Sequence, residues 1–249
     1  MSALIPKPPY PKPPITEGVI HLAVADSAPQ EQLEKLAKRF IQEYPQEEVL
    51  AAMQFMIDTT GGAATATQQL EGYRLKSADQ ADIVLVFPDG VATARLAPYL
   101  GWEYLRDRGR SAWSEWRRTV TFSALRRVGI RYINRIDVPI KQAEIIDIDT
   151  YLRFGPRVPD FSKHPLGGYL VQVTRPTDLE HWSASITTQI AVPPPLVNHV
   201  SIILDIDVFR IEQIPGREAD LWDCIEAVRP MKNAIFESCI TDEARKLFE

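Results

Sequence analysis

The sequence predicts an α+β protein, in which a mainly antiparallel sheet has helices packed on one face. Segments with the apolar alternation of strands follow one another in clusters and do not alternate one by one with helices. The turn Pro88-Asp89-Gly90 joins two of these segments as a hairpin. Each half of the chain has its own cluster of strands and its own long helix. Two similar lobes and one continuous sheet both fit this pattern.

The N-terminal half, residues 15–140, is expected to run strand, helix, strands, helix, strand. Apolar residues at helical spacing from Leu33 to Tyr44 predict the first helix. A second helical piece is predicted over Val49–Ile57, ended by Gly61-Gly62. The remaining elements are strands over 19–25, 65–76, 83–88, 91–96 and 125–138 and a helix over 102–120.

The C-terminal half, residues 141–249, is predicted to be mostly strand before it ends in helices. Strands are expected over 145–154, 169–175, 182–192 and 200–211. A helix follows from about Ala219 to Ile240 with a kink near Pro230, and Thr241 caps a short last helix. Residues 1–14 precede both halves as a proline-rich extended arm. This arm lies over the protein's own surface or docks on a neighbouring subunit.

The composition is that of an ordinary globular protein, with 45% hydrophobic and 24% charged residues. The formal net charge of −5 disfavours attraction of the whole surface to nucleic acid or anionic lipid. The sequence has no apolar run long enough for a transmembrane helix and no signal-peptide core at its N-terminus. We therefore expect a cytoplasmic protein without a membrane partner, in which Cys224 and Cys239 are reduced thiols.

The most distinctive feature is a cluster of arginines between Arg95 and Arg135. This window holds ten arginines, three acidic residues and no lysine, and aromatic residues are interleaved with them. Arginines beside aromatic side chains are typical of surfaces that bind nucleic acid, nucleotides or other polyanions. Strand alternation puts three arginines on one face of the segment 125–138, and two more lie on the preceding helix. These candidate ligand-binding residues are Arg127, Arg131, Arg135, Arg117 and Arg118.

The same arginines have a purely structural interpretation. An arginine face can pair with acidic residues elsewhere in the chain, and helical spacing places Trp113 and Trp116 in a buried stripe. Both interpretations stay open at the level of sequence.

Asp205 and Asp207, which alternation places on one strand face, form a candidate metal site. Paired carboxylates hold Mg²⁺ or Mn²⁺ in enzymes of phosphoryl chemistry. They are equally typical of the polar face of a half-buried strand, or of partners for the arginines. We expect no cofactor, with Mg²⁺ as the alternative.

The sequence has none of the common catalytic motifs. Its four histidines are scattered, and there is no HExxH pair, zinc-type cysteine–histidine cluster, G-x-S-x-G elbow, P-loop or G-x-G-x-x-G. Because catalytic triads are recognised by geometry, this absence lowers the expectation of an enzyme without excluding one. No catalytic residue is predicted.

Several segments together resemble an uncharacterised, sporadically distributed bacterial family of chains near this length. They are Lys12–Ile15 with Glu17, Ala97–Trp102, Val128–Ile136, Leu204–Phe209 and Lys232–Glu237. The family brings no established reaction, so the resemblance implies no catalytic residue. Its patchy distribution looks like that of mobile or phage-defence gene cassettes.

We therefore expect a non-catalytic binding protein, whose arginine and aromatic surface holds a nucleic acid, a nucleotide or an acidic protein partner. Two alternatives stay open. One is a Mg²⁺- or Mn²⁺-dependent enzyme that acts on phosphoesters or nucleotides through Asp205 and Asp207. The other is a scaffold that assembles into a homo-oligomer.

Overall fold

A computed structural model of the chain describes residues 10–57, 64–121, 123–140, 146–157, 159, 168–190, 196 and 198–249. The described strands are β1 (Ile15–Val24), β2 (Gln46–Ile57), β3 (Ala64–Lys76), β4 (Asp82–Phe87), β5 (Gly90–Leu96), β6 (Leu125–Pro139), β7 (Leu170–Pro176), β8 (Trp182–Ile190) and β9 (His199–Arg210). The helices are α1 (Gln30–Phe40), α2 (Trp102–Thr119), α3 (Glu218–Cys239) and α4 (Asp242–Lys246), with a 3₁₀ turn, η1, at Ile148–Thr150.

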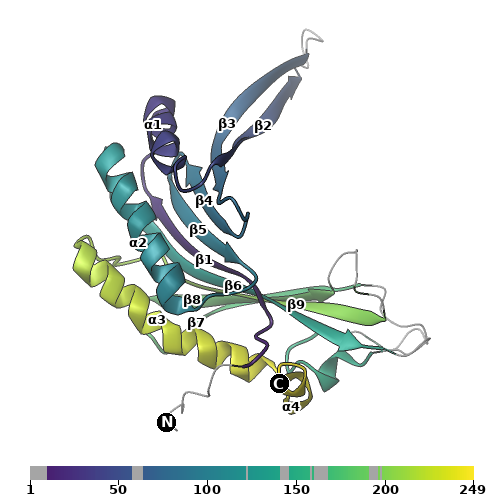
Figure 1. Cartoon of the computed structure of the whole chain (residues 1–249). Helices are drawn as coiled ribbons and strands as arrows, with labels where there is room; N and C mark the ends of the chain where they lie inside the picture. The colour runs from purple at the N-terminus through teal and green to yellow at the C-terminus, as the bar shows by residue number, and fades with distance from the viewer. Residues whose placement is uncertain are drawn as a thin grey trace. The chain divides into compact units, whose positions relative to one another are not determined.

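The described strands form one antiparallel sheet in the order β2-β3-β4-β5-β1-β6-β9-β8-β7 (Figure 1). Helices pack on this sheet, so the predicted α+β class is confirmed. None of the described helices is long and apolar enough to cross a membrane.

The chain divides into two compact units. Unit 1 comprises residues 1–18, 97–99 and 129–249, and unit 2 comprises residues 19–96 and 100–128. Both β1 and β6 contribute residues to each unit. Compact units need not coincide with folding domains, so the predicted halves 15–140 and 141–249 stay a prediction.

The two units share one pattern of strand connection. In unit 2, β3, β4 and β5 form a meander that ends beside β1, and the long helix α2 follows. In unit 1, β7, β8 and β9 form a meander that ends beside β6, and the long helix α3 follows. This likeness agrees with the expectation of two similar lobes at the level of topology.

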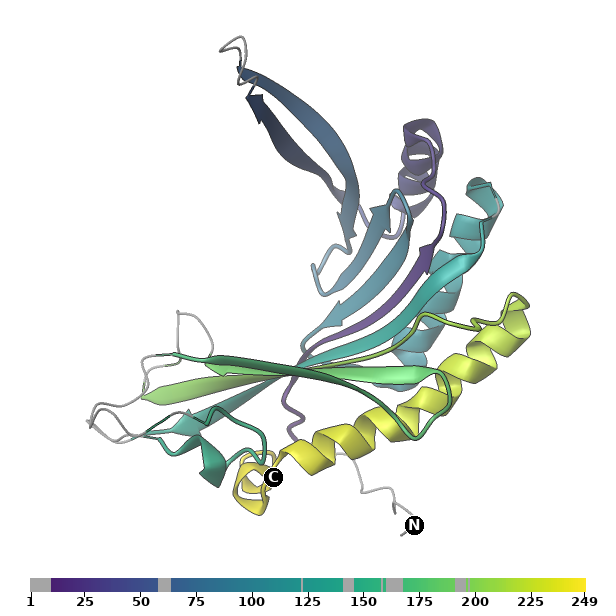
Figure 2. The same ribbon diagram turned by 180° about the vertical axis from the view of Figure 1, so that it is seen from behind.

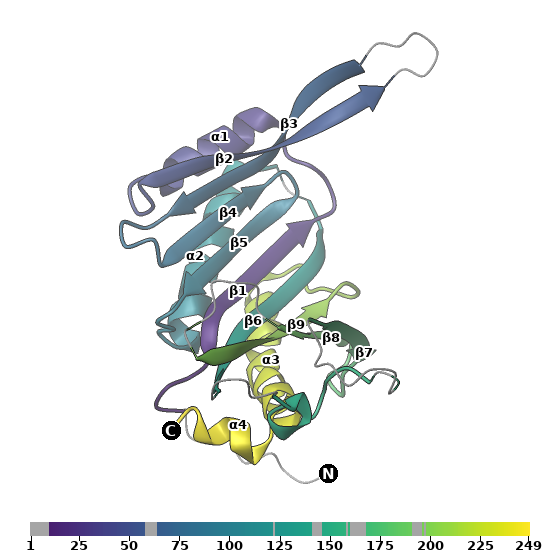
Figure 3. The same ribbon diagram turned by 90° about the vertical axis from the view of Figure 1, so that its right-hand side faces the viewer.

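Unit 2 buries the apolar stripes of α1 and α2 against its strands. Leu36 of α1 and Leu105 of α2 are fully buried, as the helical spacing predicts. Figure 3 shows α1 and α2 behind the strands β4 and β5, on a single face of the sheet. At Gly72 the pairing of β2 with β3 shifts by one residue, which is a β-bulge. Gly72 has a φ of +143°, a conformation that glycine adopts without strain.

Unit 1 buries α3 against β9. Ile202, Leu204, Ile206 and Val208 of β9 have no exposed surface, and Ile225 and Val228 of α3 are equally buried. In Figure 2, α3 runs beside β7, β8 and β9. The hydroxyl oxygen of Thr241 accepts from the backbone N–H of Ala244, so the predicted cap of the last helix is confirmed.

Residues 10–14 of the predicted arm belong to unit 1 and are hydrogen-bonded to other parts of it. The backbone N–H of Lys12 donates to the carbonyl of Phe248 at 3.0 Å, and that of Arg135 donates to the carbonyl of Pro14 at 2.8 Å. The hydroxyl of Tyr10 donates to Glu237 at 2.6 Å. Residues 1–9 lie outside the described part of the chain.

Two of the predicted elements are wrong. The helical piece predicted at Val49–Ile57 is strand β2, which pairs with β3 along its whole length. Its apolar residues fit a period of two as well as the helical period, and the pairing with β3 decides between them. The predicted turn Gly61-Gly62 lies outside the described residues.

The second wrong prediction is the strand over 145–154. Residues 148–150 form η1, and Leu152 makes only an isolated bridge to Ile240. The carboxylate of Asp147 accepts from the backbone N–H of Asp149 at 3.1 Å. This local bond favours a turn over an extended strand.

Candidate anion-binding site

Strand β6 has the alternation that the sequence predicts. Val128, Ile130, Tyr132, Ile136 and Val138 are buried, each with at most 2% of its surface exposed. Arg127, Arg131 and Arg135 lie on the opposite face of the strand. Arg127 belongs to unit 2, whereas Arg131 and Arg135 belong to unit 1.

The aromatic residues of the arginine window are mostly core residues. Trp102, Trp113, Trp116 and Tyr132 are each at most 5% exposed. Their rings are therefore not available for stacking on the bases of a nucleic acid. Phe122 lies outside the described residues.

Arg131 forms a forked ion pair with Asp205 of β9. Its Nε donates to both carboxylate oxygens at 2.9 and 3.1 Å, and its Nη2 donates to Oδ2 at 2.5 Å. The hydrogen bonds to Asp205 raise the pKa of Arg131 above its ordinary value, although partial burial acts in the opposite direction. Arg131 is therefore engaged inside the molecule, as the structural interpretation of the arginine face expects.

The two predicted metal ligands lie on β9, where Asp205 is held by Arg131. Across the strand pair, Thr187 faces Asp205 and Ser185 faces Asp207. Within the described ranges, no group of three or more histidine, cysteine, aspartate or glutamate residues is placed to hold a metal ion. The metal site at Asp205 and Asp207 therefore stays a prediction.

Arg135 is held in a fixed orientation by two neighbours. Its Nε donates to Oδ1 of Asp137 at 2.8 Å, and its Nη2 donates to the hydroxyl of Ser201 at 3.1 Å. Ser201 in turn donates to the same oxygen of Asp137. Among the described residues, no group accepts a hydrogen bond from Nη1 of Arg135. Within the described ranges, one donor group of an oriented guanidinium is thus unused.

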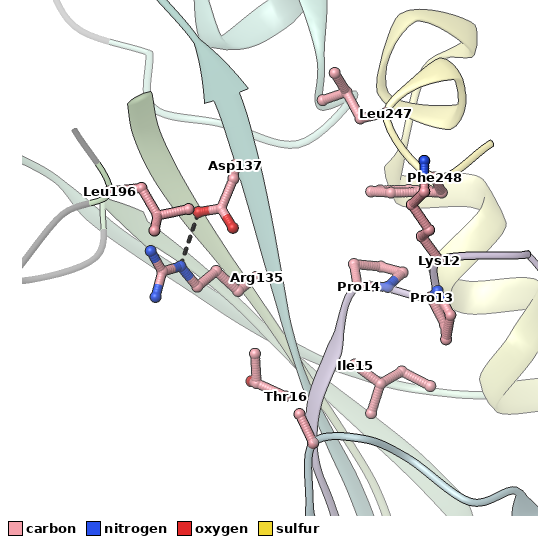
Figure 4. A pocket seen from close by; sticks show the side chains of 11 residues that line it. Lys12, Pro13, Pro14, Ile15, Thr16, Arg135, Asp137, Leu196, Leu247 and Phe248 are labelled. Carbon is pink, nitrogen blue, oxygen red and sulfur yellow. Dashed lines mark hydrogen bonds and ion pairs between the residues drawn. The ribbon is translucent and has the colours of Figure 1, made fainter. Parts of the chain in front are cut away.

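Arg135 and Asp137 line a pocket of about 350 Å³ in unit 1. Figure 4 shows these two residues with Leu196 on one side of the pocket, and Lys12 with Phe248 on the other. The ammonium group of Lys12 donates to the backbone oxygen of Glu249 at 2.9 Å. Because the lining contains two cationic side chains and one carboxylate, its formal charge is +1.

No family model matches this chain, and no curated protein does either.

Residues from several distinctive segments of the sequence meet in unit 1. The hydroxyl groups of Tyr132 and Tyr99 form a hydrogen bond, with 2.8 Å between their oxygen atoms. The ammonium group of Lys232 lies 3.7 Å from the centre of the Tyr132 ring. The pair of Arg131 with Asp205 and the bond from Arg135 to Pro14 join two more of these segments. These contacts therefore lie in the unit that contains the pocket.

Arg127 has a histidine as one of its neighbours in unit 2. Its Nη1 lies 3.1 Å from Nδ1 of His21. Because an arginine only donates, Nδ1 accepts, and the neutral ring carries its proton on Nε2. Burial, and next the positive charge of Arg127, lower the pKa of His21 to about 4.

The two candidate arginines of α2, Arg117 and Arg118, also belong to unit 2. Both are exposed. Nη1 of Arg118 donates to Glu115 at 2.7 Å, one helical turn away. Arg117 and Arg118 therefore belong to another unit than Arg135 and its pocket.

Unit 2 also contains a buried ionic cluster that the sequence patterns did not predict. Asp82 pairs with Arg95 at 2.9 Å, and these two side chains are only 5% and 6% exposed. The carboxylate of Asp82 also accepts from the hydroxyl of Tyr104 at 2.7 Å and lies 3.4 Å from Nε of Arg108. The pairing of Asp82 with Arg95 follows from the predicted hairpin. The two residues are equally far from its turn, so they face each other across the two strands.

Proposed function

We propose that this protein binds a ligand without transforming it, and that Arg135 holds a carboxylate or phosphate group of that ligand. The proposal rests on how the guanidinium of Arg135 is hydrogen-bonded. Asp137 and Ser201 fix its orientation, and its Nη1 has no acceptor within the described part of the chain. An oriented guanidinium with an unused N–H edge suits the oxygen atoms of a carboxylate or phosphate.

The charge of the pocket supports an anionic ligand. The positive charges of Lys12 and Arg135 exceed the single negative charge of Asp137. With a net charge of +1, the lining favours a ligand with one anionic group over a polyanion or a cation.

The shape and the apolar lining support a small ligand. A volume of about 350 Å³ lies near the lower end of the range for ligand pockets. Pro14, Leu196 and Phe248 offer apolar contacts beside the charged groups. These features fit a carboxylate or a phosphate ester with a short apolar or aromatic body.

A polymeric nucleic acid is less well matched to this face of unit 1. Arg131 and Arg135 lie near four carboxylates, those of Glu17, Asp137, Asp205 and Asp207. A strand of phosphates laid along β6 and β9 would therefore meet more negative than positive side chains. Binding of that kind depends on neutralising several phosphates.

Calorimetric titration of two matched variants tests the proposal. The probes are inorganic phosphate, benzoate, phenyl phosphate, adenosine monophosphate and a short single-stranded RNA. We expect at least one of the four small anions to bind, and Arg135→Gln to weaken that binding by roughly 10- to 100-fold, because a hydrogen bond to a charged group contributes about 1.5–3 kcal/mol. Arg131→Gln is the control, since it removes an arginine of the same strand face outside the pocket lining, and we expect it to leave the affinity unchanged.

Three results would contradict the proposal. The first is that none of the small anions binds. The second is that Arg135→Gln binds the small anions as well as the original protein does, with both proteins equally folded by circular dichroism. The third is that only the RNA binds and that its affinity falls steeply with salt, which would favour a polymer on another surface.

A further inference from the structure

The last strand of the sheet, β7, is exposed along its length. It pairs with β8 through seven consecutive residue pairs, from Leu170↔Gln189 to Pro176↔Ser183. In the strand order β7 is terminal, so no described strand pairs with its outer edge. Leu170 is 64% exposed and Val173 is 42% exposed. Within the described part of the chain, a row of backbone N–H and C=O groups is therefore open to pairing on this side.

The opposite edge of the sheet, β2, has protective features that β7 lacks. Strand β2 carries the charged pair Glu47 and Glu48, and its register with β3 shifts between Leu50 and Ala51. Charges and bulges are the usual means by which an edge strand avoids further pairing. The register of β7 with β8 is unbroken, its single charge is Arg175, and its proline stands only at the last position. The outer edge of β7 is thus suited to pairing with another strand.

The sequence of β7 is complementary to itself in the antiparallel direction. Around a two-fold axis at Val173, this residue faces its own copy, Gln172 faces Thr174, and Val171 faces Arg175. No like charges face each other in this register. A pair of β-branched residues and a pair of hydrogen-bonding polar residues are both favourable neighbours across two strands.

We propose that β7 is a self-association edge, on which β7 of a second copy of this chain pairs antiparallel about a two-fold axis at Val173. A two-fold axis closes the contact, because each copy contributes the same strand and no open edge is left to recruit a third copy there. One strand pair buries less than the roughly 1,000 Å² of a stable interface, so the dimer is expected to dissociate in the micromolar range.

Sedimentation velocity over the micromolar concentration range tests this edge with a charge swap. Val173→Lys puts two ammonium groups opposite each other and Val173→Asp puts two carboxylates there, so each variant alone is expected to raise the dimer dissociation constant at least about tenfold. An equimolar mixture of the two variants puts a lysine opposite an aspartate, and we expect it to dimerise at least as well as the original protein. Val49→Lys is the matched control, because Val49 is an exposed valine on β2, at 55% exposure.

The charge swap separates a lost contact from a lost fold, since a misfolded variant would not be rescued by its partner. The proposal is overturned if the original protein stays monomeric throughout the micromolar range. It is equally overturned if Val173→Lys dimerises as the original does, if the mixture stays monomeric, or if Val49→Lys alone abolishes the dimer.

Discussion

The environment of His21 predicts that acid destabilises this protein through one residue. Nδ1 of His21 accepts from Arg127 at 3.1 Å, and its ring meets Phe87 edge to face at 6.1 Å between centres. A proton on Nδ1 would break this hydrogen bond and place a second positive charge beside the guanidinium. Burial and Arg127, with a smaller effect of Arg126, lower the pKa of His21 to about 4, and Asp89 opposes this shift.

The size of the effect follows from the difference between the folded and unfolded pKa values. In the unfolded chain, His21 takes up its proton near its ordinary pKa of 6.5, whereas in the folded chain it does so only near 4. Between these values the unfolded state binds more protons, so the free energy of unfolding falls as the pH falls. The loss amounts to about 2 kcal/mol at pH 5 and levels off at about 3 kcal/mol below pH 4.

Urea unfolding of the original protein and of His21→Gln at pH 7.5, 6 and 5 measures this contribution. Glutamine keeps an acceptor for Arg127 but does not titrate. The stability of the original protein relative to the variant should therefore fall by about 2 kcal/mol between pH 7.5 and pH 5. A difference that stays constant within about 0.5 kcal/mol over this range would contradict a lowered pKa of His21 in the folded protein.

Two further predictions concern the stability of unit 2. Asp82→Ala leaves the buried Arg95 without its main partner, so we expect a loss of about 3–5 kcal/mol in the free energy of unfolding. Asp79→Ala, which removes an exposed carboxylate 3.9 Å from Arg95, should destabilise the protein clearly less. Gly72→Ala would place its Cβ 2.1 Å from the carbonyl oxygen of Val86, at a φ of +143°, so we expect a loss of at least about 2 kcal/mol. Gly168→Ala, with no atom within 4 Å of the added carbon, is the control, and equal melting temperatures for the two glycine variants would contradict this prediction.

Local patterns predicted most of the fold. The apolar residues that alternate along β6 and those that form the stripe of α2 are buried in the structure. Each pattern arises because one face of the element packs against the core. The helical prediction for Val49–Ile57 is wrong because Val49, Met53 and Ile57 fit both periods, and the strand is specified by its partner β3. Such pairing is a tertiary effect that a single segment does not encode.

The site was predicted only in part, because its partners come from distant parts of the chain. Alternation indicated that Arg131 and Arg135 share a face, but Asp205, which engages Arg131, is 74 residues away in sequence. Ser201, which helps to orient Arg135, is 66 residues away. The pocket joins Lys12 near one end of the chain with Phe248 near the other. No spacing rule in the sequence connects these residues.

The role of Arg135 is tested most directly by nuclear magnetic resonance of the arginine side chains. The guanidinium ¹⁵N and ¹³Cζ signals of Arg135 and Arg131 are followed while inorganic phosphate, and separately benzoate, is added at constant ionic strength. We expect the signals of Arg135 to shift and saturate with at least one of these anions, while those of Arg131 stay in place beside Asp205. Signals of Arg135 that do not move, or that move no more than those of Arg131 and without saturation, would contradict it.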